Sequence, residues 1–516
     1  MISEKIQEVL TSEEAAAFIR VSSKTLSQMA RLGHVPAQKV GREWRFLRSA
    51  LENWLANPRL LLDDTPTASG SATIATRETA QVKSGFADSA FTENRNRPLH
   101  RWVPWVAGFS AGFVADVLTL APPPPGVTVM DPFAGVGTTP VEALRLGYHV
   151  IGFEINPFAH LACRVKLGSA SLDVQAVRAR SRAFCEYVAF RTADSEAKPA
   201  ARRPADFKSR APFFSPNVER QVLFALDFLG QEDDEQIRDI LRLALGATLV
   251  SYSNYSYEPS LSRRAASGKP DIIDAYVSDI LALKLEQMCE DIVGFKQEMR
   301  ALSAPPTAEL YLESCLDGYA HLRPGSVDVL ITSPPYLNNY HYLRNTRPQL
   351  HWLDLIAGTA AIREIEMQSF GKFWQTVRGG PREDLLLDYP ELAEVIAQVR
   401  ELNPGKGVYG GAGWANYAAT YFNDCARFCE GTARVMKREG LVVVVIGNNI
   451  LQGLEIKTDE FFAAIAERYG FVVRAMHCVR KKRTGSSIVN SSVRANGDRR
   501  ATELYETAVE LTAPGP

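Results

Sequence analysis

The residues with the clearest chemical potential follow directly after the apolar stretch SVDVLIT and read Ser333-Pro334-Pro335-Tyr336. Such a stretch predicts a strand, and open α/β sheets bind ligands beyond the carboxyl ends of their strands. The two prolines stiffen this turn. An amine on an aromatic ring is a poor nucleophile because its lone pair is delocalised into the ring. The Ser333 hydroxyl and the Pro334 carbonyl are suitable acceptors for the N–H groups of such an amine, and Tyr336 offers a flat face for stacking its ring.

A second set of chemically informative residues lies upstream, in the segment Asp131-Pro132-Phe133-Ala134-Gly135-Val136-Gly137-Thr138-Thr139. Its glycines let the backbone turn sharply after a strand and approach a ligand closely, and its threonines begin the next helix. About twenty residues on, a second strand ends at Glu154, whose carboxylate is placed to accept hydrogen bonds from both hydroxyls of a ribose. We expect Asp131 and Glu154 to flank a nucleoside-sized ligand.

Both segments resemble motifs of the amino-methyltransferase family, which has a D-P-F-x-G-x-G-T-T loop, an acidic residue ending the next strand, and an S/D/N-P-P-Y/F/W motif. The form T-S-P-P-Y is most often seen in its cytosine-N4 branch. The resemblance implies that S-adenosylmethionine is the cofactor and that Ser333, Pro334, Pro335 and Tyr336 are catalytic. The implied cofactor-binding residues are Asp131, Pro132, Phe133, Ala134, Gly135, Gly137, Thr138, Thr139, Glu154 and Ile155, with Phe109 and Ser110 upstream.

One position departs from the family pattern. The family usually has Gly-Asp just before the catalytic strand, with the Asp reaching the adenine amino group of the cofactor. This chain has Glu313 and Ser314 there. Ser314 is expected to accept the same hydrogen bond, less strongly than a carboxylate would.

The implied activity is transfer of a methyl group to the N4 amino group of a flipped cytosine in DNA. N6-adenine methylation stays open because the acceptor geometry suits either amino group, and an RNA or protein substrate stays open as well. A third alternative is a DNA-binding regulator with an inactive methyltransferase domain. Cytosine C5 methylation is disfavoured, since that chemistry uses a thiolate from a Pro-Cys pair and none of the seven cysteines follows a proline.

The elements that must position these motifs are those of an α/β, Rossmann-like, doubly wound sheet. The segment GVTVMDPFAGVGTTPVEALRLGYHVIGFEINP has the pattern of one βαβ unit. The stretch from about 169 to 301 is helix-patterned, so we expect a helical insertion that serves as a target-recognition region and contains Arg263 and Arg264. Gly and Pro between about 371 and 416 predict loops before the helix FNDCARFCEGTARVMK. Buried strands are expected at LVVVVIG and at Glu503 to Leu511.

The N-terminal segment from Leu10 to Leu55 predicts two short helices, at 12–20 and 22–32, then a wing at 40–46 and a helix at 49–55. It resembles the excisionase-type winged helix-turn-helix family, whose second helix enters the major groove. The implied DNA contacts are Ser23, Lys24, Thr25, Gln28 and Arg31, with Arg42 and Arg45 on the wing. A linker rich in Ser, Thr, Ala, Gly and Asp follows. The predicted domains are 1–57, a linker at 58–96, and a methyltransferase domain at 97–516.

Composition neither supports nor excludes nucleic acid as a partner, because 58 Lys+Arg against 59 Asp+Glu give a net charge of -1 over 516 residues. Basic surfaces must therefore be local. Arg480-Lys481-Lys482-Arg483 is one candidate for phosphate contact, with an ordinary solvated loop as the alternative. The predicted partners are double-stranded DNA and a cognate restriction or defence protein. A cytoplasmic protein without a membrane segment is expected. The cysteines lack metal-site spacing, so buried free thiols and no metal site are predicted.

Overall fold

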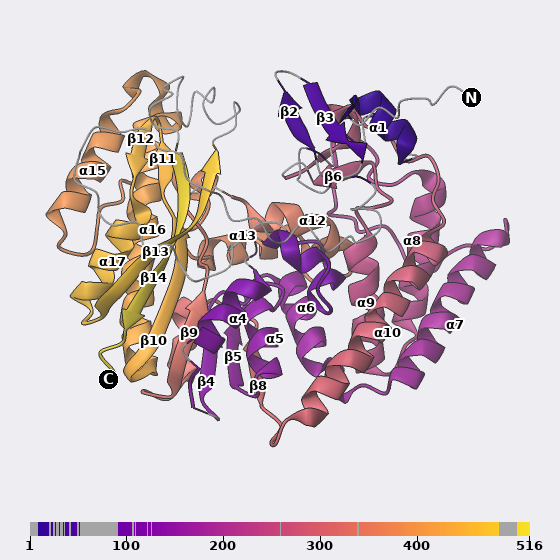
Figure 1. The fold of residues 1–516 in the computed structure, drawn as a ribbon, viewed down its shortest axis with the longest axis horizontal. Helices are drawn as coiled ribbons and strands as arrows, with labels where there is room; N and C mark the ends of the chain where they lie inside the picture. Colours follow the sequence, from indigo (N-terminus) through magenta and orange to yellow (C-terminus); the bar gives the residue numbers. More distant parts are fainter. Residues whose placement is uncertain are drawn as a thin grey trace, which may run out of the picture. The chain divides into compact units, whose positions relative to one another are not determined.

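The computed structural model (Figure 1) describes residues 9–19, 22–23, 26, 30, 35, 37–40, 43–48, 51, 91–105, 108, 110–120, 122–124, 126–257, 260–337, 340–483 and 503–516. The chain divides into two compact units, residues 1–80 and 81–516. The predicted domain boundaries at 57 and 96 stay predictions, because residues 52–90 lie outside the described residues.

The N-terminal unit contains β1 (Val9–Leu10), α1 (Ser12–Phe18), β2 (Gln38–Val40) and β3 (Glu43–Leu47). The strands form an antiparallel sheet in the order β1-β3-β2. Helix α1 begins in a capping box: the Thr11 hydroxyl accepts the Glu14 N–H at 3.3 Å, and the Glu14 carboxylate accepts the Thr11 N–H at 2.9 Å. The predicted first helix and the wing hairpin are present. The second and third predicted helices lie largely outside the described residues.

The larger unit is built on a seven-stranded sheet in the order β13-β14-β10-β9-β4-β5-β8. Its strands are β4 (Thr128–Asp131), β5 (His149–Phe153), β8 (Ala308–Tyr311), β9 (Val327–Thr332), β10 (Met436–Gly447), β13 (Val472–Arg483) and β14 (Glu503–Thr512). Strand β14 runs antiparallel to β10 and β13, and the other neighbours are parallel. This arrangement confirms the predicted doubly wound α/β fold.

The apolar side chains of the strands point alternately to the two faces of the sheet, so each face has its own hydrophobic core. In β4, Val129 belongs to one core and Met130 to the other; in β9, Val329 and Leu330 divide in the same way. The first core is closed by α4 (Ala111–Leu120), α5 (Thr138–Arg145) and the helical insertion. The second is closed by α11 (Cys315–Gly318), α16 (Gly411–Val435) and α17 (Thr458–Arg468).

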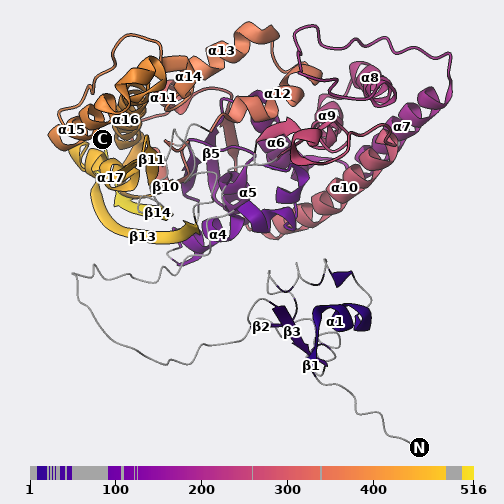
Figure 2. The ribbon, with the colours of Figure 1, turned by 90° about the horizontal axis from the view of Figure 1, so that it is seen from above.

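The helical insertion is confirmed, with one addition. Its helices are α7 (Val174–Ala193), α8 (Pro216–Gly230), α9 (Glu235–Thr248) and α10 (Val277–Ala301), and α6 (Pro157–Gly168) leads into it. Between α9 and α10 lies a small hairpin, β6 (Tyr255–Tyr257) and β7 (Leu261–Arg263), which helical periodicity did not predict. Figure 2 shows the long helices α7 and α10 side by side, and Arg178 pairs with Glu286 across them at 3.0 Å.

The predicted loops between 371 and 416 are wrong in part. That region contains α14 (Trp374–Val377) and α15 (Pro390–Glu401), and α16 already begins at Gly411. The glycines that indicated loops are instead sites of close packing. A Cβ on Gly411 would lie 2.0 Å from the Val399 carbonyl oxygen, and one on Gly413 would lie 2.1 Å from that of Val408. The remaining elements are α12 (Tyr342–Trp352), α13 (Gly358–Gln368) and the hairpin β11 (Asn449–Leu451) and β12 (Leu454–Ile456).

None of the described helices is both long and apolar enough to cross a membrane.

A buried carboxylate on α10 ties the start of the larger unit to the insertion. Asp291 accepts the Leu99 N–H at 2.9 Å, the Trp102 indole N–H at 2.9 Å and the Arg101 guanidinium at 2.6 Å.

Asp291→Ala should lower the free energy of unfolding by about 3 kcal/mol, because it leaves Arg101 and two buried donors without their acceptor. Denaturant unfolding measures this loss. Glu290→Ala, at an exposed carboxylate 4.0 Å from the same guanidinium, should change stability by under about 0.5 kcal/mol. Equal losses in both variants would contradict the assignment.

Candidate active site

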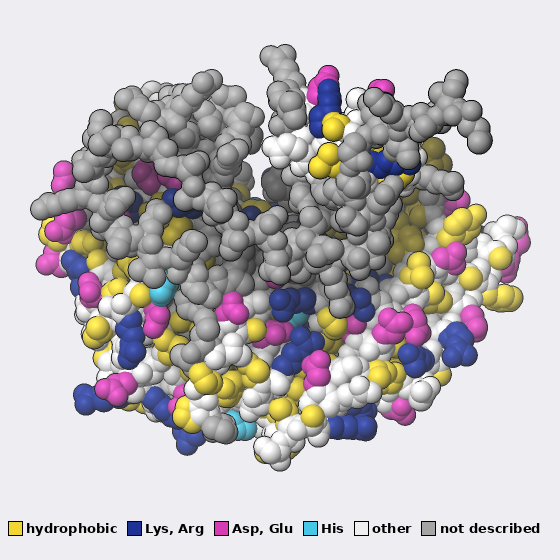
Figure 3. Space-filling view, in the orientation of Figure 1, with side chains coloured by type: hydrophobic (Ala, Val, Ile, Leu, Met, Phe, Trp, Pro, Cys, Tyr) yellow, Lys and Arg dark blue, Asp and Glu magenta, His cyan; other side chains and the backbone are white. Residues whose placement is uncertain are grey.

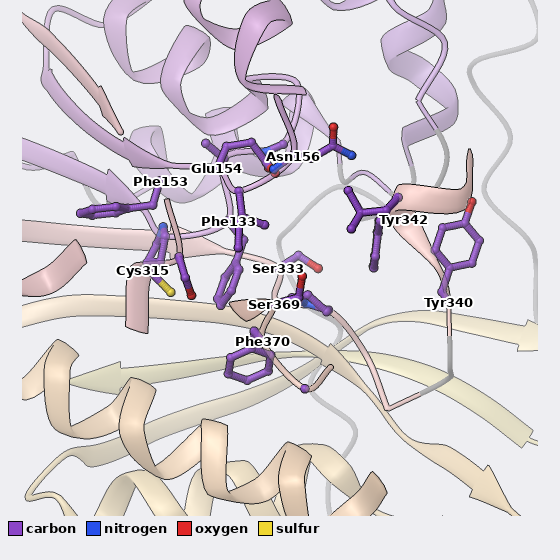
Figure 4. Close-up of a pocket in the computed structure, with 18 of the residues that line it drawn as sticks. Phe133, Phe153, Glu154, Asn156, Cys315, Ser333, Tyr340, Tyr342, Ser369 and Phe370 are labelled. Carbon is purple, nitrogen blue, oxygen red and sulfur yellow. The ribbon is translucent and has the colours of Figure 1, made fainter. Parts of the chain in front are cut away.

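The two chemically informative segments meet at the carboxyl ends of two neighbouring parallel strands, β4 and β9. The sheet continues to β5 and β8 on one side of this pair and to β10 on the other, so the chain changes direction between them. This is the position where open α/β sheets have their ligand crevice. A cavity lies there (Figure 4), and it is lined by eleven of the predicted site residues: Pro132, Phe133, Ala134, Gly135, Thr138, Glu154, Ile155, Ser314, Ser333, Pro335 and Tyr336.

The glycine-rich loop after β4 has the backbone conformation that its sequence predicts. Gly135 and Gly137 have φ of 54° and 89°, a region that residues with a side chain rarely adopt. A Cβ on Gly137 would also lie 3.0 Å from the Cys163 sulfur. Helix α5 begins at Thr138, so its first N–H groups lie at the loop beside the cavity. The backbone from Gly135 to Thr138, called the cradle below, therefore leaves room for a polar ligand to lie close to it.

Glu154 follows β5 and is held at both of its oxygens. Its Oε2 accepts the Gly135 N–H at 2.8 Å, and its Oε1 accepts the Asn156 N–H at 2.7 Å. Burial raises the pKa of this carboxyl to about 7. Each oxygen keeps further acceptor capacity for a second donor. The lining carboxylate and the glycine cradle therefore fit a ligand with two vicinal sugar hydroxyls, as S-adenosylmethionine has.

Asp131 occupies a different place from the predicted one. Its Oδ1 accepts the Thr332 hydroxyl at 2.6 Å and the Phe133 N–H at 3.0 Å. The side chain is buried, Oδ2 has no partner among the described residues, and burial raises the pKa to about 6. The carboxylate therefore joins the ends of β4 and β9 and is not among the residues that line the cavity; its predicted contact with a ligand stays a prediction. Thr139, also predicted as a ligand contact, makes a second link by donating to the Ile331 carbonyl at 3.3 Å.

Three other predicted residues do not line the cavity. Gly137 and Pro334 stand beside lining residues, and the Ser110 hydroxyl is fully buried and accepts the Gly112 N–H at 3.1 Å. Phe109 lies outside the described residues. Ser314 does line the cavity, at the start of α11, and makes no capping hydrogen bond with its own helix. Its predicted contact with an adenine stays a prediction.

The turn at Ser333 to Tyr336 is held by hydrogen bonds from two sides. The Ser333 hydroxyl donates to the Tyr336 hydroxyl at 3.2 Å, which leaves the Ser333 oxygen able to accept. From α16, the Tyr421 hydroxyl donates to the Pro335 carbonyl at 3.0 Å. Among the described residues, none donates to the Pro334 carbonyl oxygen. Burial holds the pKa of Tyr336 well above its usual value, so its hydroxyl stays protonated. Within the described residues, the turn therefore has two oxygens with acceptor capacity, on Ser333 at the cavity and on the adjacent buried Pro334, beside a neutral phenol.

A glycine at the end of β10 lets this strand approach β14 closely. A Cβ on Gly447 would lie 2.7 Å from the Tyr505 carbonyl oxygen, whereas its 3.6 Å distance from the Tyr336 ring would be an ordinary van der Waals contact.

The remaining wall of the cavity was missed by sequence analysis. It comes from Tyr340 and Tyr342 around the start of α12, from segment 369–373 after α13, and from Tyr417 and Tyr421 on α16. Phe370 lies edge-on to Phe133 at 5.1 Å between ring centroids, as Figure 4 shows. Tyr340 and Tyr342 stand four and six residues after Tyr336 of the turn motif, whereas segment 369–373 and the two tyrosines of α16 adjoin no motif. Only the fold identifies the latter two groups as part of the wall.

Several of the predicted DNA contacts lie outside the described residues. Those outside are Lys24, Thr25, Gln28, Arg31 and Arg42, together with the side chains of Lys482 and Arg483. Ser23 is exposed, whereas Arg45 pairs with Glu43 at 2.6 Å. Arg263 is exposed on the hairpin, and Arg264 donates to the Pro270 carbonyl at 2.8 Å. On the face that Figure 3 shows, basic and acidic side chains are interspersed over the described residues.

Two further expectations need correction. The basic run at 480–483 is part of strand β13, where Lys481 pairs with Glu503 of β14 at 3.3 Å, and is not a solvated loop. All seven cysteines are free thiols, but Cys478 is exposed, unlike the buried thiols that the sequence predicted. Within the described residues, no cluster of His, Cys, Asp and Glu has the arrangement of a metal site.

Comparison with known proteins agrees with this geometry. Residues 9–59 match the family described as "Helix-turn-helix domain", and residues 114–163 match the family described as "DNA methylase". The chain is 23% identical to the Type II methyltransferase M.BsoBI of Geobacillus stearothermophilus, over 77% of this chain and 83% of that protein. It is 22% identical to the Type II methyltransferase M.AvaI of Anabaena variabilis, over 74% and 81%. These similarities support a DNA methyltransferase with an N-terminal helix-turn-helix domain.

The bond between Thr332 and Asp131 should contribute measurably to stability. Thr332→Val removes the hydroxyl while keeping the shape, and it should lower the free energy of unfolding by about 1 to 3 kcal/mol, because Asp131 loses a buried hydrogen bond. Denaturant unfolding is the measurement. Thr420→Val, which removes a buried hydroxyl that donates to the Asn416 carbonyl of its own helix, should cost less. A larger loss of unfolding free energy in Thr420→Val than in Thr332→Val would contradict the contribution assigned to the bond between Thr332 and Asp131.

Proposed function

We propose that this protein transfers the methyl group of S-adenosylmethionine to the N4 amino group of a cytosine flipped out of double-stranded DNA. The observation that carries the proposal is the junction of the two motifs. Thr332 is hydrogen-bonded to Asp131 at the end of β4, which leads into the glycine-rich loop, and the next residue, Ser333, begins the turn whose oxygens would accept from the base. Donor and acceptor sites for one group transfer thus share a single cavity.

The cofactor half of the cavity would hold S-adenosylmethionine through groups that it already orients. Glu154 would accept the ribose hydroxyls, the Gly135 to Thr138 segment would cradle the ligand, and Ser314 would accept from its adenine. Bound there, the cofactor supplies a methyl group on a sulfonium, an electrophile that needs no further activation by the protein.

The catalytic turn would prepare the nucleophile. The Ser333 oxygen and the Pro334 carbonyl accept the two amino N–H groups of the base, which aims the nitrogen lone pair at the methyl group. With the cofactor bound, the nitrogen would form the N–C bond as the S–C bond breaks, S-adenosylhomocysteine would be the leaving group, and the methylated amine would give one proton to solvent. Tyr336 stacks on the flipped base and offsets part of the cost of unstacking it. Burial keeps Tyr336 neutral, so it does not repel the electron-rich base.

Cytosine N4 is favoured over adenine N6 because the turn begins with Ser, as in the branch of the family that it resembles. Adenine N6 methylation is the alternative that keeps this mechanism and changes the base. The similarity to Type II methyltransferases favours a restriction-modification setting, with a cognate nuclease or defence protein as a partner, and a DNA substrate implies work in the cytoplasm.

Duplex DNA would be held by surfaces around the cavity. The β6–β7 hairpin is anchored to α12, since Tyr257 donates to the Asn345 carbonyl at 3.1 Å and the Asn345 side chain accepts the Leu261 N–H at 2.9 Å. Helix α12 begins at Tyr342, which lines the cavity. Arg263, which is exposed on this hairpin, would contact backbone phosphates, and the N-terminal unit would add duplex affinity.

Variants of the turn test the proposal. Ser333→Ala should lower kcat for labelled methyl incorporation into duplex DNA by about 10- to 100-fold, the value of one hydrogen bond to a group that gains charge. Tyr336→Phe keeps the ring and should cost less than Tyr336→Ala, which also loses stacking. Ser326→Ala, at the opposite end of β9, is the matched control and should keep the wild-type rate. Full activity in Ser333→Ala would refute the proposed role, and DNA binding without any methyl transfer by the wild type would favour a regulator.

The pH dependence of cofactor binding tests Glu154. Because burial raises its pKa to about 7, the carboxyl is mostly protonated at pH 6 and mostly ionised at pH 8. The ionised form accepts both ribose hydroxyls, so the dissociation constant of S-adenosylmethionine should fall about tenfold from pH 6 to pH 8. Equilibrium dialysis measures it. Glu154→Gln should bind more weakly with a flatter profile, whereas Glu313→Gln, at a second lining carboxylate, should keep the wild-type profile. An unchanged profile in Glu154→Gln would exclude this role.

A further inference from the structure

A lysine ammonium is completely buried behind the cofactor loop. Lys166, on α6, is 0% exposed, and its Nζ donates to the Val136 carbonyl at 2.7 Å. Among the described residues, no carboxylate forms an ion pair with it. Burying a cation without a counter-ion costs several kcal/mol. A methionine would fill the same space without that cost, so the core alone does not explain a lysine here.

Lys166 donates to a loop residue that stands between two glycines. Val136 stands between Gly135 and Gly137, whose φ values of 54° and 89° are both in the left-handed region. The peptide joining Val136 to Gly137 is held at both ends, because its N–H donates to the Ala134 carbonyl at 2.8 Å and its C=O accepts from Lys166. Gly137 on one side of this peptide, and Gly135 one residue before it, make the loop backbone easier to rotate, so the bond from Lys166 restrains it.

The orientation of this peptide controls groups that face the cavity. The Gly135 N–H donates to the Glu154 carboxylate at 2.8 Å, and Thr138, at the start of α5, follows the same peptide. Gly135, Val136 and Thr138 all line the cavity. A rotated peptide would therefore displace both the cradle and the acceptor for the sugar.

We propose that Lys166 is a positioning residue for the cofactor, which through the Val136 carbonyl holds the loop in the form that receives S-adenosylmethionine. The inference rests on the proposed function and extends it to a residue outside the cavity. The proposed role of Lys166 requires only that its amino group donates a hydrogen bond, in either protonation state. Burial lowers the pKa of Lys166 to about 7, with the Cys163 thiol and Lys284 as its titratable neighbours, and the neutral amine still donates to a carbonyl.

The test compares two lysines that make the same bond in different places. Lys166→Met removes the donor at the loop. Lys296→Met removes a 2.7 Å bond from a lysine on α10 to the Leu172 carbonyl, away from the cavity. Calorimetric titration with S-adenosylmethionine and with S-adenosylhomocysteine, run on folded full-length protein, should show dissociation constants about tenfold higher in Lys166→Met and unchanged in Lys296→Met.

Steady-state rates separate positioning from a general loss of structure. Lys166→Met should raise KM for the cofactor with little change in kcat or in affinity for duplex DNA. Lys166→Gln, which keeps an N–H donor on a shorter chain, should bind the cofactor better than Lys166→Met and serves if the methionine variant is unstable. Wild-type cofactor affinity in both Lys166 variants would overturn the inference. Failure of the wild type to bind the cofactor at all would overturn the proposed function instead.

Discussion

The structure depends on one short hydrogen bond, 2.6 Å from the Thr332 hydroxyl to the Asp131 carboxylate. It joins the carboxyl ends of two parallel strands that are neighbours in the sheet and about two hundred residues apart in the chain. On one side of this link the backbone becomes the glycine-rich loop, and on the other it becomes the Ser333 turn. Because the bond is buried, water does not compete for it, and the distance between the two halves of the site is set by the sheet.

Buried ionisable groups are concentrated around the cofactor loop. Burial raises the pKa of Asp131 to about 6 and of Glu154 to about 7, and it lowers the pKa of Lys166 to about 7. Such groups are costly in a structural core, and their presence at one cleft is typical of a functional site. Each is hydrogen-bonded to backbone or hydroxyl groups of the loop and its neighbouring strands. These hydrogen bonds offset part of the cost of burial and fix the loop where a ligand would bind.

The sheet, the insertion and both motifs could be predicted because each leaves a local signal. Apolar residues alternate or run continuously along the strands, and the turns after β4 and β9 use residue types that their geometry demands. The rest depends on tertiary contacts. Gly411 indicates a loop by composition, yet the Val399 carbonyl oxygen 2.0 Å from its would-be Cβ shows that it permits packing. Asp131 was expected at the ligand, but its partner Thr332 is visible only in the fold. Phe370 and Tyr417 reach the cavity from segments without a motif.

The most direct test of the central claim is the chemical identity of the product. Duplex DNA incubated with the protein and S-adenosylmethionine bearing a deuterated methyl group is digested to nucleosides and analysed by mass spectrometry. The account predicts the label in N4-methylcytosine, and label in N6-methyladenine would keep the site and its chemistry while changing the base. Label in 5-methylcytosine, or cofactor binding without label in any nucleoside of several unmodified DNAs, would contradict transfer to an exocyclic amine of DNA.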